Sequence, residues 1–141
     1  MDRPYRLVLD DSPGLADLAL LEDQVAAAAI AAAGVGNDRA FAIFVRDDDD
    51  RLIAGVSGST WGGYCELHAM WVDEPHRGRG LARALMSGAE AEARRRGCGV
   101  VAFLAYDLLA RGLYEHLGYE VVGSIEGYPA GSAARWYRKT L

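Results

Sequence analysis

The chain has 141 residues, of which 51% are hydrophobic and 25% are charged, and its formal net charge is −5. This length and composition suit one folded, soluble domain and exclude a disordered chain, so we expect a single domain over residues 1–141. An acidic chain is a poor match for phosphate-rich surfaces. We therefore expect no nucleic-acid partner, no membrane partner and a cationic small-molecule substrate.

Signals for a membrane span or a disulfide framework are weak. The longest apolar run, Val25–Gly36, has only twelve residues and cannot span a bilayer core of about 30 Å. The two cysteines, Cys65 and Cys98, lack the spacing of a disulfide framework or a metal site. We therefore expect a cytoplasmic protein that holds no metal.

The first predicted elements in chain order are a strand and a helix. Residues Tyr5–Leu9 alternate weakly and predict a strand. Ser12 and Pro13 then provide an N-cap and a proline at the first helical position, and apolar residues recur at helical spacing up to Ile30. Gly34 is expected to end this run, which forms either one long helix or two short ones.

Three strands are predicted next. Residues 41–46 and 52–60 are rich in β-branched and aromatic side chains and flank four consecutive aspartates, which predicts a hairpin. Tyr64–Val72 follows a glycine turn and alternates as a strand does. Its two predicted faces consist of Cys65, Leu67, Ala69 and Trp71, and of Glu66, His68, Met70 and Val72.

The remaining pattern alternates helices and strands. An apolar stripe predicts a helix from Leu81 to about Arg96, ended by Gly97, and the apolar run Val100–Leu104 predicts a strand covered on both faces. Strand, helix and strand in succession predict a parallel crossover. Asp107 is expected to cap another helix, and two last strands flank the loop 127–131. The apolar stripe of that helix consists of Leu109, Ala110, Leu113, Tyr114 and Leu117.

The segment Arg77-Gly78-Arg79-Gly80-Leu81-Ala82, here called the helix entrance, combines positive charge and glycine where a helix begins. The first N–H groups of a helix lack internal partners, and the helix dipole adds about half a positive charge there, so this end attracts phosphate. Gly78 and Gly80 have no Cβ to keep an anion from those groups. The spacing matches neither a P-loop nor a dinucleotide-binding fingerprint, and a tight turn with solvated arginines fits it equally well.

Two segments together resemble the GNAT superfamily of acyl-CoA-dependent N-acetyltransferases. The helix entrance matches the family's R/Q-x-x-G-x-G/A pattern after a strand, and Asp107-x-x-Ala110-x-x-Leu113-Tyr114-x-x-x-Gly118-Tyr119 is similar to its N-x-x-A-x-x-L-Y-x-x-x-G-F segment. The resemblance implies an α/β fold with one GNAT-type domain. It further implies a mixed central sheet of about six to seven strands, about four flanking helices, and a parallel strand-helix-strand crossover at the CoA cleft.

The same resemblance implies acetyl-CoA as the acyl donor. In the family, the amides of the first segment bind the diphosphate of coenzyme A, the preceding strand lies along the pantetheine arm, and strand amides polarise the thioester carbonyl. The cofactor-binding residues implied in this chain are Met70, Trp71, Val72, Arg77, Gly78, Arg79, Gly80, Leu81, Ala82 and Asp107. Asp107 stands where the family usually has asparagine.

Acetyl transfer requires a neutral amine, whereas an alkylamine with a pKa of about 10.4 is mostly protonated at neutral pH. Glu66 and His68 share one predicted strand face, so both can reach an acceptor. The ordinary pKa of histidine, about 6.5, is nearer to that of the amine than the glutamate value of about 4.3. We predict that His68 is the base and that Glu66 binds the ammonium; a hydrogen-bonded core histidine and a solvent-facing glutamate are the alternatives.

Two tyrosines complete the predicted site. Tyr114 occupies the family's tyrosine position, where the resemblance implies a hydroxyl that faces the CoA sulfur. Because a phenol with a pKa of about 10 is a weaker acid than a thiol at about 8.5, we predict a hydrogen bond to the departing thiolate, with a core tyrosine as the alternative. Tyr128 is predicted to line the acceptor pocket, or else to belong to an ordinary hairpin loop.

The expected function is transfer of the acetyl group of acetyl-CoA to a primary amine of a small molecule, by direct attack in a ternary complex. Two alternatives stay open. One is a non-catalytic acyl-CoA-binding module, and the other is an acetyltransferase that acts on a protein lysine or N-terminus. Edge strands at the C-terminal end also leave a homodimer open.

Overall fold

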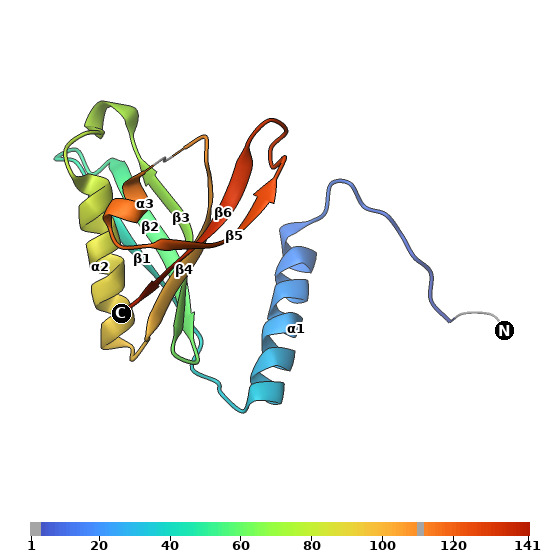
Figure 1. The fold of residues 1–141 in the computed structure, drawn as a ribbon. Coiled ribbons are helices and arrows are strands. Elements are labelled where there is room, and N and C mark those ends of the chain that lie inside the picture. Colours follow the sequence, from blue (N-terminus) through green and yellow to red (C-terminus); the bar gives the residue numbers. More distant parts are fainter. Residues whose placement is uncertain (1–3, 110–111) are drawn as a thin grey trace. The chain divides into compact units, whose positions relative to one another are not determined.

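The computed structural model of the protein describes residues 4–109 and 112–141. The chain forms two compact units, one up to Gly36 and one comprising Asn37–Leu141, whose elements are labelled in Figure 1. In the N-terminal unit, helix α1 (Leu15–Ala33) begins after Gly14 and ends at Gly34, so the predicted run is one helix. None of the helices in the described ranges combines the length and apolarity needed to cross a membrane.

Two details of the N-terminal prediction are wrong. The segment Tyr5–Leu9 has no regular secondary structure, because alternation over a few residues does not supply the hydrogen-bonded neighbour that stabilises a strand. Ser12 is not the N-cap of α1. Its backbone N–H instead donates to Asp10 Oδ1 at 3.0 Å, which places it in a turn before the helix.

The C-terminal unit is built on a six-stranded mixed sheet in the order β1-β2-β3-β4-β6-β5. The predicted hairpin and the strand after it are confirmed as an antiparallel meander, and β3 and β4 form the predicted parallel crossover. The strands are β1 (Arg39–Arg46), β2 (Leu52–Trp61), β3 (Tyr64–Val72), β4 (Val100–Tyr106), β5 (Glu120–Glu126) and β6 (Ala133–Thr140).

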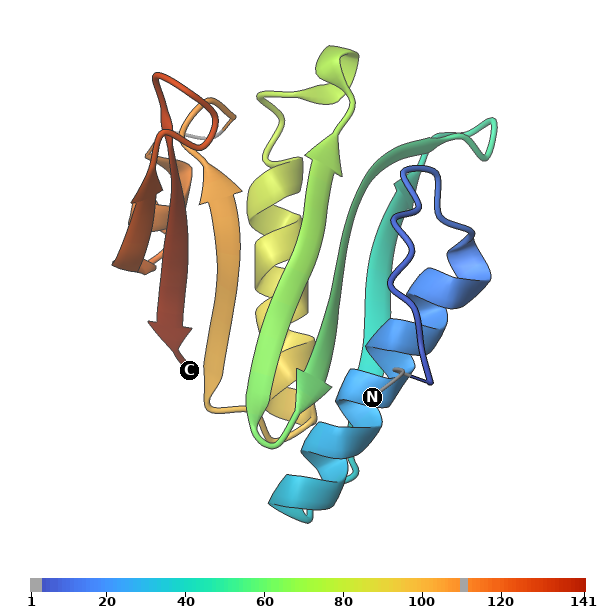
Figure 2. The same ribbon diagram turned by 90° about the vertical axis from the view of Figure 1, so that its right-hand side faces the viewer.

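Helix α2 (Leu81–Arg95) packs against one face of this sheet, as Figure 2 shows. The predicted stripe is confirmed, because Leu85, Met86, Ala89 and Ala93 are all buried in the core between α2 and the sheet. A short 3-10 helix, η1 (Glu74–His76), connects β3 to the helix entrance.

The helix predicted after Asp107 is much shorter than expected. Residues 107–109 form a turn, Ala110 lies outside the described residues, and α3 (Leu113–His116) begins only after Gly112, whose φ of 80° is left-handed. The Asp107 carboxylate does not cap a helix but accepts hydrogen bonds from Arg135 Nε at 2.8 and 3.1 Å. The described helices are therefore α1, α2 and α3 with the short η1, rather than about four full helices.

A β-bulge interrupts β3 at His68. Ser57 of β2 pairs with Ala69, whereas the next residue of β2 pairs with Leu67, so His68 is an extra residue in the ladder. A bulge of this kind bends the strand and increases its local twist.

The bulge also changes which side chains share a face. Met70 and Val72 pack against the core beside α2, so the prediction that they share a face with Glu66 and His68 is wrong. Glu66 and His68 do lie on the same face, because Ser59 pairs with Glu66 and its hydroxyl reaches the His68 ring. Alternation read from sequence fails here because one extra residue reverses every later position.

Candidate active site

The two central strands separate toward their carboxyl ends (Figure 2). Within the described strands, β3 and β4 are joined by three residue pairs, Tyr64 with Val100, Cys65 with Val101 and Glu66 with Ala102. Beyond these pairs, β3 stays paired with β2 and β4 with β6. The facing backbone edges at the ends of β3 and β4 are therefore open to a ligand.

A cavity of about 670 Å³ lies in this opening. Its walls come from the end of β3, the helix entrance of α2, the end of β4 and the short helix α3. The volume falls within the range of about 300–1,000 Å³ that is typical of small-molecule and cofactor sites.

Most residues of the helix entrance line the cavity. Gly78 and Gly80 have left-handed φ values of 74° and 81°, and a Cβ added at either position would meet no atom within 4 Å. Backbone conformation rather than crowding therefore requires glycine at both positions. The hydrogen bond from Ala84 N–H to Gly80 O, 3.0 Å long, opens the helix, so the N–H groups of Leu81 and Ala82 precede the helical ladder.

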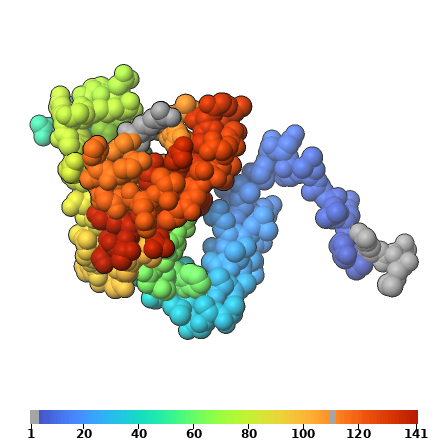
Figure 3. Space-filling model, viewed as in Figure 1, coloured from blue at the N-terminus to red at the C-terminus, as the bar shows by residue number. Residues whose placement is uncertain are grey.

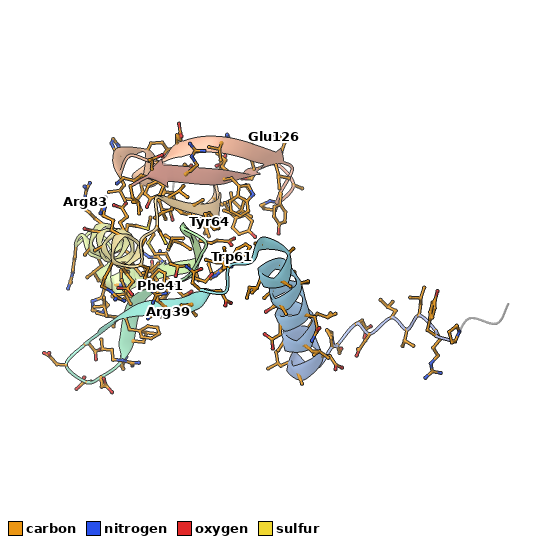
Figure 4. The ribbon with its side chains drawn as sticks, turned by 90° about the horizontal axis from the view of Figure 1, so that it is seen from below. Arg39, Phe41, Trp61, Tyr64, Arg83 and Glu126 are labelled. Carbon is orange, nitrogen blue, oxygen red and sulfur yellow. The ribbon has the colours of Figure 1, made fainter. Side chains whose placement is uncertain are left out.

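The cavity lining near this entrance is basic. His76, Arg77 and Arg83 line the cavity, and Arg83 projects outward from α2 in Figure 4. Arg77 Nε donates to the Val72 carbonyl at 2.9 Å, which holds its side chain against the end of β3. No acidic residue occurs in the cavity lining that the structure describes. Together with the positive end of the α2 dipole, these groups suit an anion.

Tyr114 lies on another wall of the cavity. It lies on α3 and is only 7% exposed, and its ring packs edge-on against Phe103, with 4.5 Å between the ring centroids. Burial raises the pKa of this phenol, so the hydroxyl stays protonated at neutral pH. Tyr114 also belongs to the lining of the cavity, so its side chain is within reach of a bound ligand.

His68 lines the cavity at the bulge of β3. Its Nε2 lies 2.9 Å from Ser59 Oγ, so the ring is tied to β2 through one nitrogen and its other nitrogen is left for a second partner. Glu66 lies two residues earlier on the same strand face, outside the lining of the cavity.

Tyr106 and Tyr128, here called the tyrosine pair, meet beside the cavity. The Tyr106 hydroxyl donates to the Tyr128 hydroxyl at 3.3 Å, and the ring centroids are 5.4 Å apart in an edge-to-face arrangement. This hydrogen bond raises the pKa of Tyr106. Tyr106 lines the cavity, whereas Tyr128 adjoins it through this contact.

Most of the predicted site residues meet in this one cavity. The lining contains His68, Met70, Trp71, Val72, Arg77, Gly78, Gly80, Leu81, Ala82 and Tyr114. It does not contain Glu66, Arg79, Asp107 or Tyr128 among its described residues.

The lining residues that sequence reasoning missed include His76, Tyr106, Leu109 and Leu113. Leu109 and Leu113 fitted a helical stripe and were expected to pack in a core. Tyr106 lies just beyond the predicted strand 100–104, and the only available signal was its place at the carboxyl end of a parallel strand, where ligands commonly bind.

This fold and this site define an α/β protein with a ligand cavity between two diverging strands at the entrance of a helix. The family model for the Acetyltransferase (GNAT) family matches residues 5–119. The chain therefore belongs to the GNAT family of acetyltransferases, which confirms the resemblance found in the two sequence segments.

Several proteins of similar sequence or structure are named as acetyltransferases. A relative from Agrobacterium fabrum is 31% identical over 119 residues, covering 84% of this chain and 87% of the relative. The blasticidin-S acetyltransferase of Streptomyces morookaense is 31% identical over 102 residues, covering 72% and 75%. The crystal structure of an acetyltransferase from Agrobacterium tumefaciens matches 97% of this chain and all of its own, with a TM-score of 0.88 and 29% identity.

Proposed function

We propose that the protein transfers the acetyl group of acetyl-CoA to a primary amine of a small molecule, by direct attack in a ternary complex. The observation that carries this proposal is the shared cavity, which joins a helix entrance rich in glycine and arginine, an open strand edge and the side chain of Tyr114. Acetyl-CoA presents three groups that match them in order: a diphosphate, an amide-containing arm and a thioester. Membership of the acetyltransferase family supports this choice of donor.

Donor binding uses mainly backbone groups. The N–H groups of residues 78–82 bind the diphosphate, and Arg77 and Arg79 add positive charge around it. The open edge of β3 at Met70–Val72 bonds the amides of the pantetheine arm as a neighbouring strand would, and an N–H there polarises the thioester carbonyl. The Asp107 carboxylate accepts hydrogen bonds from Arg135. In this proposal that contact supports the turn of residues 107–109, from which Leu109 lines the cavity.

The reaction forms one C–N bond and breaks one C–S bond. The neutral amine nitrogen attacks the thioester carbonyl carbon, and coenzyme A leaves as a thiolate that accepts a hydrogen bond from the Tyr114 hydroxyl. His68 takes the proton that the nitrogen loses: with Nε2–H donated to Ser59, Nδ1 carries the lone pair. Glu66, on the same face of β3, binds the acceptor as an ammonium before that proton leaves.

The acceptor is a small molecule in this proposal, because one relative is a blasticidin-S acetyltransferase. The tyrosine pair borders the acceptor side of the cavity in this proposal, since Tyr106 lines the cavity at the end of β4 and its hydroxyl donates to the Tyr128 hydroxyl.

The direct test is incubation of purified protein with acetyl-CoA and a panel of free amines, with blasticidin S included, together with lysine-containing peptides. Released coenzyme A is measured with a thiol reagent, and acetylated products are identified by mass spectrometry. We expect turnover on at least one free amine and a preference for free amines over peptides. Peptide preference would shift the acceptor to proteins, and tight acetyl-CoA binding without any product would favour a non-catalytic module.

A His68→Gln variant tests the assignment of the base. Glutamine can still hydrogen-bond Ser59 but cannot accept a proton, so we expect turnover to fall about tenfold or more with acetyl-CoA affinity unchanged. His116→Gln, an exposed substitution on α3, is the matched control and should keep full activity. Unchanged turnover in His68→Gln would remove the base role and leave the donor site intact.

A further inference from the structure

A buried polar cluster connects the helix that carries the entrance to the helix that carries Tyr114. Glu90, on α2 and 7% exposed, accepts hydrogen bonds from the Tyr119 hydroxyl at 2.9 Å and from Lys139 Nζ at 3.0 and 3.1 Å. Lys139 Nζ also donates to the Leu117 carbonyl at 2.8 Å. We call Glu90, Tyr119 and Lys139 the Glu90 cluster.

The Glu90 cluster joins elements that are far apart in the sequence. Glu90 lies nine residues after Leu81, or about 13.5 Å along α2. Lys139 comes from β6, and Tyr119 follows α3 and precedes β5. In Figure 3 the residues of α3, β5 and β6, orange to red, form the surface next to α2, in yellow.

The short helix α3 needs this external support. It has four residues and begins after a left-handed glycine, and an isolated single turn is unstable in water. Its C-terminal end is fixed by two bonds to the Tyr114 carbonyl, from Leu117 N–H at 3.1 Å and Tyr119 N–H at 3.0 Å. Both donor residues are held by the Glu90 cluster, Leu117 through its carbonyl and Tyr119 through its hydroxyl.

The ion pair within this cluster is shielded from water. The side chain of Glu90 is 9% exposed and that of Lys139 is 25% exposed. Removing one partner of such a pair leaves a poorly solvated charge, so the local structure rearranges to rehydrate it. The residues nearest to that rearrangement are Leu117 and Tyr119, which hold the backbone of Tyr114.

We infer that Glu90 and Lys139 are positioning residues: they set the Tyr114 hydroxyl at the site where the thiolate departs, at a fixed distance from the helix entrance. This inference rests on the proposed function, in which Tyr114 acts on the thioester sulfur and the entrance binds the diphosphate. The diphosphate and the sulfur belong to one donor molecule, so their two binding elements must keep a constant separation. The Glu90 cluster links α2 to the end of α3 and so keeps this separation constant.

The first test replaces Lys139 with methionine, which keeps the length of the side chain and removes its charge. Because a small displacement of a catalytic group costs much of its effect, we expect kcat to fall about tenfold with the KM and affinity for acetyl-CoA unchanged. Tyr119→Phe is a milder second variant that removes one hydrogen bond to Glu90, and we expect a threefold fall in kcat at about the same KM.

Two arginines provide matched controls. Arg94 lies 4.0 Å from the same Glu90 carboxylate, but its side chain is 53% exposed. Arg138 neighbours Lys139 on β6 and faces the exposed Glu120. Arg94→Met and Arg138→Met should keep the kcat of the parent protein, and a fall in kcat equal to that of Lys139→Met would show a general charge effect and overturn the inference.

A double-mutant cycle with Tyr114→Phe decides whether the cluster acts through Tyr114. If it does, Lys139→Met or Tyr119→Phe lowers kcat in the parent protein but not in the Tyr114→Phe background. Equal losses in both backgrounds would overturn the inference while leaving the role of Tyr114 in place. Full turnover in Tyr114→Phe alone would overturn the proposed role of Tyr114, and the positioning role with it.

Discussion

The two ends of the cavity between β3 and β4 are built in different ways. At the helix entrance, one continuous segment lines the cavity, two left-handed glycines set its backbone geometry, and we propose that its N–H groups bind the ligand. At the other end, single side chains from β3, β4 and the loop before β6 converge, among them His68 and the tyrosine pair. A backbone-built site tolerates most side-chain changes but not a change of glycine, whereas a side-chain-built site can be altered one residue at a time.

The largest expected effect is that of Gly80→Val at the helix entrance. A β-branched residue is strained by about 1–3 kcal/mol at the left-handed φ of Gly80, so the turn rearranges and the N–H groups no longer converge on the diphosphate. We expect CoA affinity to fall about 100-fold by calorimetry, from the loss of several charge-assisted hydrogen bonds.

Gly97→Val is the matched control for that experiment. Gly97 follows α2 at its far end with a φ of 79°, and a Cβ there would also meet no atom within 4 Å. The two variants should lose similar thermal stability. A similar loss of CoA affinity in Gly97→Val would mean that general destabilisation, and not the local turn, explains the result at Gly80.

Tyr114→Phe comes next and separates chemistry from donor binding. Removing one hydroxyl from a buried ring leaves the packing against Phe103 in place but deletes the donor to the thiolate. We expect kcat to fall about 30-fold with unchanged CoA affinity, by steady-state kinetics and calorimetry. Tyr64→Phe is the control: burial raises the pKa of that β3 tyrosine to about 12, but it lies outside the cavity lining and its loss should not affect kcat.

The tyrosine pair should show a smaller effect that is confined to the acceptor. Tyr106→Phe and Tyr128→Phe each break the same 3.3 Å hydrogen bond. We expect either substitution to raise the acceptor KM about three- to fivefold with no change in the KM for acetyl-CoA, and the double variant to add nothing further. A raised KM for acetyl-CoA would contradict the division of the cavity into two ends.

The smallest effect is expected at the C-terminal end of α2. There we expect a change of charge to alter the stability of the fold and not the affinity for CoA. Hydrogen bonds from Arg95 and then Arg96 lower the pKa of Glu92 from 4.5 to about 2. A carboxyl group whose pKa is lowered by folding stabilises the protein above pH 4.5, and that contribution is lost as the pH falls toward 2.

Glu92→Gln should therefore be slightly less stable than the parent protein at pH 7, and the difference should vanish in thermal melts between pH 4.5 and 2. CoA affinity at pH 7 should be unchanged, because Glu92 is absent from the described lining of the cavity. A stability difference that grows on acidification would show that the ion pairs with Arg95 and Arg96 do not stabilise the fold.

Sequence could predict the helix entrance because its geometry is local. Glycine at positions 78 and 80, arginine at positions 77 and 79 and an apolar stripe after them are all readable within one segment. The same holds for α2, whose stripe from Leu85 to Ala93 is buried as expected, and for the meander β1-β2-β3, whose strands are separated by short turns.

The remaining features depend on partners that are distant in the sequence. The bulge at His68 follows from how β3 registers with β2, and the opening between β3 and β4 follows from pairing that stops at Glu66. Asp107 suits a helix cap locally, but Arg135 binds it from β6. Glu90 interrupts an apolar helix face, and its partners are distant in the sequence, Tyr119 just before β5 and Lys139 on β6, so its buried cluster has no local signal.

The crystal structure of the protein with bound coenzyme A tests the central claim most directly. The diphosphate should lie at the helix entrance, with its oxygens about 2.7–3.2 Å from backbone nitrogens of residues 78–82 and the sulfur beside the Tyr114 hydroxyl. A complex in which the diphosphate contacts only side chains, or binds away from the start of α2, would contradict it.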